Sequence, residues 1–188
     1  MFCGSNSGRD ELYATAAREL GSELAASGIE LVYGAGSVGL MGMVADATLE
    51  AGGRVTGVIP RALATRELMH AQLTETLVVA DMHERKATMA RLADAFIALP
   101  GGYGTLEELF EAVTWAQLGI HSKPVGLVNS AAFFDPLLAM LDHAVREGFL
   151  REEHRNLLVV ASGARELLGE LQRIPRPAIV DWRAKLEA

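Results

Sequence analysis

Short hydrophobic segments rich in β-branched residues alternate along this chain with longer segments in which apolar residues recur every three or four positions. The first pattern is typical of buried strands, and the second is typical of amphipathic helices. We expect strands at residues 1–3, 30–33, 55–59, 76–80, 95–99, 125–129 and 157–160. We expect helices at residues 10–27, 40–51, 82–93, 106–118, 136–147 and 164–172.

This alternation predicts an α/β protein, with a Rossmann-like three-layer α/β/α domain around a mainly parallel sheet of about seven strands. A chain of 188 residues fits one such domain, residues 1–188. The first strand is shorter than usual, so we expect the natural strand to begin upstream. Residues 175–188, which contain two prolines and then charged positions, are expected to form a covering tail.

Composition and charge narrow the classes of function. The apolar runs are too short to span a membrane, and the first residues lack the pattern of a secretory signal. The net charge of −7 argues against nucleic acid and acidic membranes as partners. The single cysteine, Cys3, is expected to be a small apolar residue rather than a nucleophile. We therefore expect a cytoplasmic protein.

Two glycine-rich segments follow the first two strands, at residues 4–8 and 34–39. Right-handed βα units bring such loops to the carboxyl edge of the sheet, where exposed N–H groups at helix N-termini favour anions. We therefore take Ser5, Gly34 and Gly36 as candidate ligand contacts. The G-x-G-x-x-G spacing alone is a weak signal, because residues 58–61 lack the acid of a dinucleotide site. A tight packing turn explains this loop equally well.

A stronger signal is the segment at residues 100–108, PGGYGTLEE, which follows an apolar strand and opens a helix. The density of glycine favours a phosphate cradle made by the N–H groups of Gly102 and Gly104 with the Thr105 hydroxyl. The alternative is structural, since Thr105 and Glu108 also have the spacing of a capping box. The additional carboxylate of Glu107, which a cap does not need, favours the ligand site.

Cations also stand at the start of the preceding helix, where Asp81 and Glu84 form another possible capping box. Arg85 and Lys86 lie near the positive end of the helix dipole, where local stability does not favour them. A phosphate or carboxylate partner explains them better than a solvated charged face does.

At these residues the chain resembles the Lonely-guy family, whose signature is P-G-G-x-G-T-x-x-E together with R-K in an M-H-x-R-K-A segment. Residues 34–42, 66–68 and 114–119 also look like family sequence, so the resemblance covers nearly all of the chain. It implies hydrolysis of the N-glycosidic bond of cytokinin riboside 5′-monophosphates and of AMP, giving free base and ribose 5-phosphate. It also implies a homodimer.

The resemblance places the catalytic pair of the family on Arg85 and Glu108. The substrate contacts that it implies are Glu67, Lys86, Gly101, Gly102, Tyr103, Gly104, Thr105, Leu106, Glu107 and Thr114. We expect Glu108 to bind the ribose hydroxyls and offset oxocarbenium charge, while Arg85 holds the phosphate or polarises the reacting end. Arg85 cannot be a base because it stays protonated.

Three other functions remain open from the residues. One is a general nucleoside 5′-monophosphate nucleosidase used in salvage, and another is a nucleotide or cofactor carrier without chemistry. A pyridoxal-phosphate decarboxylase would need a Schiff-base lysine, and the chain has only Lys86, Lys123 and Lys185. No cofactor is expected, and no metal is expected because the five histidines have no ligand spacing.

Overall fold

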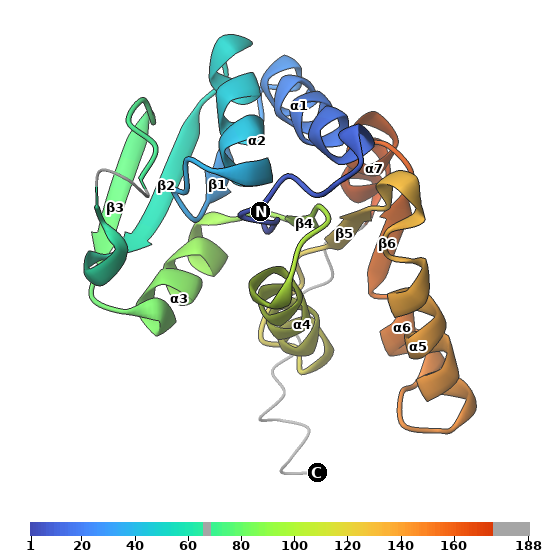
Figure 1. The fold of residues 1–188 in the computed structure, drawn as a ribbon. Helices are drawn as coiled ribbons and strands as arrows, with labels where there is room; N and C mark the ends of the chain where they lie inside the picture. Colours follow the sequence, from blue (N-terminus) through green and yellow to red (C-terminus); the bar gives the residue numbers. More distant parts are fainter. Residues whose placement is uncertain (66–68, 175–188) are drawn as a thin grey trace.

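The computed structural model describes residues 1–65 and 69–174 and has three layers (Figure 1). Parallel strands form the middle layer, and helices cover both faces. One outer layer contains α1 (Glu11–Ala26), α2 (Gly39–Glu50) and α7 (Ala164–Arg173). The other contains α3 (Met82–Leu92), α4 (Tyr103–Gln117), α5 (Asp135–Arg146) and the short α6 (Glu152–Arg155). The predicted α/β class is confirmed.

The described strands form two parallel sheets of three, with the orders β1-β2-β3 and β4-β5-β6. They are β1 (Leu31–Tyr33), β2 (Val55–Pro60), β3 (Glu75–Val79), β4 (Phe96–Ala98), β5 (Val125–Val128) and β6 (Leu158–Ala161). Our expectation of about seven strands was wrong, because residues 1–3 form only an isolated parallel bridge from Phe2 to Ala98. This segment still lies between β1 and β4, since Met1 donates a hydrogen bond to the Val32 carbonyl and Phe2 donates one to Ile97.

Successive side chains along a strand point to opposite faces of the sheet, so they enter two separate cores. Ile97 faces the core beneath α1, α2 and α7, whereas the neighbouring Phe96 faces the core beneath α3, α4 and α5. Both cores contain fully buried side chains, and Leu20 in one and Leu109 in the other have no solvent exposure. Burial on both faces explains why these strands read as continuous apolar runs.

The helix starts fit the sequence in two cases and differ in a third. Asp10 caps α1 through its contact with the Leu12 N–H, and Asp81 caps α3 through the Glu84 N–H. The capping box at Thr105 and Glu108 is not formed, because α4 begins three residues earlier than expected, with Gly102 as its N-cap. Thr105 is therefore inside the first turn, where its side chain is buried.

Two predictions cannot be placed, and three short elements were missed: α6 and the 3-10 turns at Arg61–Leu63 and Ser130–Ala132. The tail at residues 175–188 and Glu67, within residues 66–68, lie outside the described residues. The single turn of α6 had no expected counterpart, because four residues are too few to show a helical period. Among the described helices, none is long and apolar enough to cross a membrane.

Candidate active site

A cleft of about 460 Å³ lies at the carboxyl ends of the strands, where the sequence predicted the ligand loops to meet. Its walls come from the loop after the Phe2 bridge, the loop after β4, and the first turns of α2, α3 and α4. Polar and charged groups line one part of it, and Tyr13, Met41 and Phe133 supply apolar surface in another.

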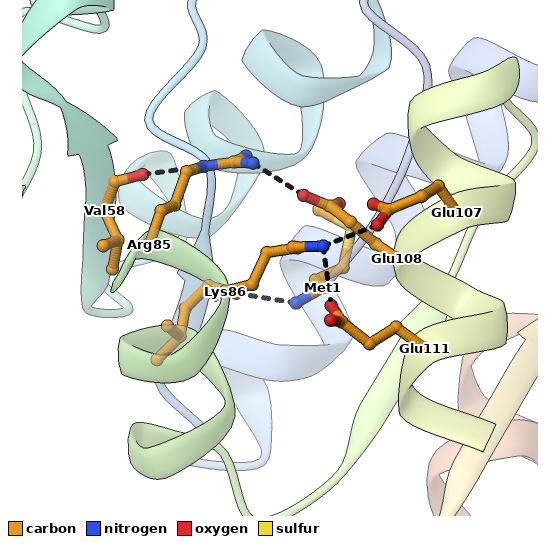
Figure 2. A network of polar contacts seen from close by, with 8 residues as sticks. Met1, Val58, Arg85, Lys86, Glu107, Glu108 and Glu111 are labelled. Carbon is orange, nitrogen blue, oxygen red and sulfur yellow. Dashed lines mark hydrogen bonds and ion pairs between the residues drawn. The ribbon is translucent and has the colours of Figure 1, made fainter. Parts of the chain in front are cut away.

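Arg85 from α3 and Glu108 from α4 form an ion pair inside this cleft (Figure 2). The Arg85 Nη1 lies 2.6 Å from Oε1 of Glu108, and each side chain is only 12% exposed. Arg85 also donates from Nε to the carbonyl of Val58 within β2, at 3.1 Å. The carboxylate of Glu108 is therefore fixed in the cleft by a guanidinium that is itself fixed to the sheet.

Gly34 makes room for this guanidinium. A Cβ atom at this position would stand 1.9 Å from Nη2 of Arg85, which is too close for any side chain. Gly34 was a predicted ligand contact, but it does not line the cleft formed by the described residues. The structure places this glycine directly against the Arg85 guanidinium.

The glycine loop before α4 lines the cleft over residues 100–105. Gly101 is required by packing, because a Cβ there would lie 2.1 Å from the Thr105 hydroxyl. Gly102 and Gly104 are different, since an added Cβ would meet nothing within 4 Å and neither has a positive φ. α4 also begins at Gly102 without a side-chain cap, and such a helix N-terminus suits an anion site.

Lys86 extends from α3 toward α4 (Figure 2) and does not line the cleft of the described residues. Its Nζ lies 2.5 Å from Oε1 of Glu107 and 3.1 Å from Oε2 of Glu111. The hydrogen bond that Lys86 donates to Glu107 raises the pKa of Lys86 most, and the contact with Glu111 adds to the effect. Glu107 does line the cleft, so Lys86 neutralises a carboxylate of the site from behind.

The cleft brings together nine of the residues that the sequence singled out: Ser5, Arg85, Gly101, Gly102, Tyr103, Gly104, Thr105, Glu107 and Glu108. Gly36, Lys86, Leu106 and Thr114 do not line it within the described part of the chain. Leu106 packs against the core under α4. Thr114 lies eleven residues beyond Tyr103, about 16 Å further along the helix.

Two aromatic lining residues carried no signal in the sequence. Tyr13 is a single aromatic position within α1, and Phe133 stands in the turn before α5. Glu111 was also missed, although it stands four positions after Glu107 on the same helix face, the spacing at which helix side chains meet.

A family model described as possible lysine decarboxylase matches residues 41–171. The cytokinin riboside 5′-monophosphate phosphoribohydrolase LOG of Oryza sativa subsp. japonica is 56% identical over 172 residues, covering 92% of this chain and 71% of that protein. The corresponding enzyme LOG5 of Arabidopsis thaliana is 54% identical, covering 92% and 75%.

Solved structures with the same fold are more distant in sequence. The molybdenum cofactor binding protein of Rippkaea orientalis superposes with a TM-score of 0.69 at 22% identity, covering 90% of this chain and 92% of that one. At this identity the likeness concerns the fold alone.

Proposed function

This chain belongs to the Lonely-guy family of cytokinin riboside 5′-monophosphate phosphoribohydrolases, and we propose that it hydrolyses the N-glycosidic bond of such nucleotides. The products are the free base and ribose 5-phosphate. AMP is included among the proposed substrates. The observation that carries the proposal is the Arg85–Glu108 pair, held in the cleft beside the N-terminus of α4.

In the proposed mechanism, a positive part of the site binds the negative phosphate, and a negative side chain faces the positive charge that develops on the ribose. The first turn of α4, with its N–H groups and helix dipole, receives the 5′-phosphate. The Glu108 carboxylate contacts the ribose and offsets the positive charge that develops as the C–N bond breaks. Arg85 keeps this carboxylate oriented before substrate binds, so that little reorganisation is needed in the transition state.

The contacts of the two described lysines disfavour the pyridoxal-phosphate decarboxylase alternative. Lys86 is bound by Glu107 and Glu111, and Lys123 donates to the Ala90 carbonyl. Neither lines the cleft of the described residues. A Schiff base needs a lysine that reaches the bound substrate as a neutral amine.

We also propose that two copies associate as a homodimer and that the protein acts in the cytoplasm. Large apolar side chains stand exposed on α4 and just after it, and on α5 and its following turn: Phe110, Leu118, Ile120, Met140 and Phe149. We place the proposed contact between the two copies at these side chains, because exposed apolar surface favours association.

Variants of the two catalytic candidates test the proposed roles. Glu108→Gln keeps the shape of the side chain but removes its charge, so turnover is expected to fall by roughly 10²–10³-fold. Arg85→Ala is expected to lower turnover as well, because the carboxylate loses its fixed orientation. Glu50→Gln, an exposed carboxylate at the far end of α2, is the matched control. Base release by either candidate variant at the rate of the control would refute its assigned role.

A further inference from the structure

Glu111 occupies a position that the reaction as proposed does not use. It lies one helical turn after Glu107 on α4, and its carboxylate is 3.1 Å from the Lys86 ammonium (Figure 2). The side chains of Glu111 and Lys86 are 26% and 15% exposed, whereas that of Glu107 is 56% exposed. The Lys86–Glu111 contact is therefore the more sheltered of the two that Lys86 makes.

This contact lies behind the cleft, between α3 and α4. Glu111 and Lys86 line a small apolar hollow together with Met89, Phe96 and Trp115. Glu108 also borders this hollow, although it belongs to the cleft as well. The ammonium and its carboxylates thus bridge the two helices that carry Arg85 and Glu108.

Local helix stability does not account for Glu111. Glu107 and Glu111 are four residues apart on one face of α4, and two like charges at this spacing destabilise a helix by a few tenths of a kcal/mol. Lys86 from another helix lies between them and neutralises both. The arrangement is understandable as a link between helices.

Arg85 and Lys86 are consecutive residues of α3, so their side chains leave the helix about 100° apart. Both nevertheless end on α4, one on Glu108 and the other on Glu107 and Glu111. A single contact would allow α3 to pivot about it, whereas two contacts in different directions fix its rotation relative to α4.

We propose that Glu111 is a positioning residue, which holds the Lys86 ammonium against α4 and thereby keeps Arg85 aligned with Glu108. The effect of Glu111 on turnover rests on the proposed function, whereas its ion pair with Lys86 is independent of that function. Because a displacement of about 1 Å at a reacting group can cost ~10²-fold in rate, Glu111 acts on kcat. If Glu111 acted through its charge alone, its removal would favour binding of the negatively charged phosphate and would lower KM.

Two measurements on Glu111→Gln, Glu111→Asp and the control Glu50→Gln test the proposal. The first is steady-state release of base from AMP and from N6-isopentenyladenosine monophosphate. For Glu111→Gln we expect kcat to fall about tenfold with KM changed less than about twofold. Glu111→Asp is expected to recover part of kcat, and Glu50→Gln is expected to match the wild type.

The second measurement needs no activity. Partial acylation with an amine-reactive ester, quantified by mass spectrometry, gives the reaction rate of Lys86 relative to Lys123. Loss of Glu111 lowers the pKa of Lys86 and loosens its side chain, so this ratio is expected to rise several-fold in Glu111→Gln. The control is expected to leave it unchanged.

The outcomes separate the two proposals. An unchanged acylation ratio, or a Glu111→Gln variant with wild-type kcat and a lower KM, would overturn the positioning role while the proposed function stands. Absence of base release from the wild-type protein would overturn the proposed function and the role of Glu111 in turnover. The acylation ratio would then still decide whether Glu111 holds Lys86.

Discussion

The guanidinium of Arg85 is held on three sides, by the Val58 carbonyl, by the Glu108 carboxylate and by the bare backbone of Gly34. These contacts come from segments that lie far apart in the sequence, and they leave the charged group only slightly exposed. Because the geometry exists before any substrate enters, the carboxylate does not have to be oriented during the reaction.

Gly34→Ala tests this arrangement without changing a charged residue. The new methyl group would stand 1.9 Å from Nη2, so the guanidinium must shift, and we expect its contact with Glu108 through Nη1 to be disturbed. Turnover is expected to fall by about 10²-fold, as for a misplaced catalytic group. Gly169→Ala is a suitable control, because a Cβ there meets nothing within 4 Å. Wild-type turnover in Gly34→Ala, measured as base release, would show that the contact with Gly34 does not matter.

Cys3 offers a second test, because burial raises the pKa of its thiol to about 12. Between the ordinary pKa of a thiol and this value the folded protein binds more protons than the unfolded one, so this group lowers stability as pH rises through that range. At pH 8 the folded protein is expected to be nearly inert to a disulfide reagent, whereas the unfolded chain reacts at one thiol. Rapid, stoichiometric labelling of the folded protein at pH 8 would be inconsistent with this burial.

Sequence reasoning singled out the glycine loop and Arg85 because their motifs combine unusual residues, and these residues line the same cleft. It could not tell where each side chain points. The structure places Lys86 behind the cleft and Gly34 under Arg85. Neither position could be predicted, because both depend on contacts between segments that are distant in the chain. Glu111 carried only the weak signal of helix spacing.

Among the helices and strands, the N-terminus of α4 is the element that most directly indicates an anion-binding site. Its first turn begins directly at Gly102, without a side-chain cap. An uncapped helix start leaves N–H groups unsatisfied by the chain itself. Glycine at residues 102 and 104 keeps the approach to those groups open.

Substitution of Gly104 by alanine distinguishes a role in packing from a role in ligand binding. Gly104→Ala is expected to stabilise the fold by about 0.5–1 kcal/mol, because it lies in a helix and its Cβ meets nothing. The same change is expected to raise KM for the monophosphate several-fold, since the methyl group narrows the approach to the N–H groups. Thermal melts and steady-state kinetics measure the two effects.

Gly169→Ala, in the middle of α7, serves as the control with the same gain in stability. It should leave KM unchanged. If Gly104→Ala also left KM unchanged, the phosphate would not bind at this turn.

The elements themselves were largely predictable, because buried strands and amphipathic helices have clear periods. β5 and α3 fall within one residue of their expected limits. The start of α4 was misplaced because the T-x-x-E pattern imitates a capping box, whereas the helix begins at the glycines. Residues 1–3 were expected as a strand, but three residues gave only one bridge.

At the scale of the whole molecule, the apolar side chains exposed at the end of α4 and around α5 bear on assembly. Light scattering after size exclusion is expected to give the mass of two chains of 20.1 kDa each. Leu118→Glu is expected to shift the protein toward the monomer, because a charge at a desolvated contact is costly.

Leu12→Glu, which changes an equally exposed leucine on α1, is the control and should leave the mass unchanged. A monomer mass for the wild-type protein at micromolar concentration would contradict the proposed dimer. A dimer that resists Leu118→Glu would place the contact elsewhere.

We propose above that this cleft breaks the N-glycosidic bond of nucleoside 5′-monophosphates. The most direct measurement is chromatographic detection of free base after the purified protein is incubated with AMP and N6-isopentenyladenosine monophosphate, with the matching nucleosides alongside. We predict release of base from the monophosphates, in equal amount with ribose 5-phosphate, and none from the nucleosides. No release from any nucleotide would contradict the account and leave a nucleotide or cofactor carrier as the better description.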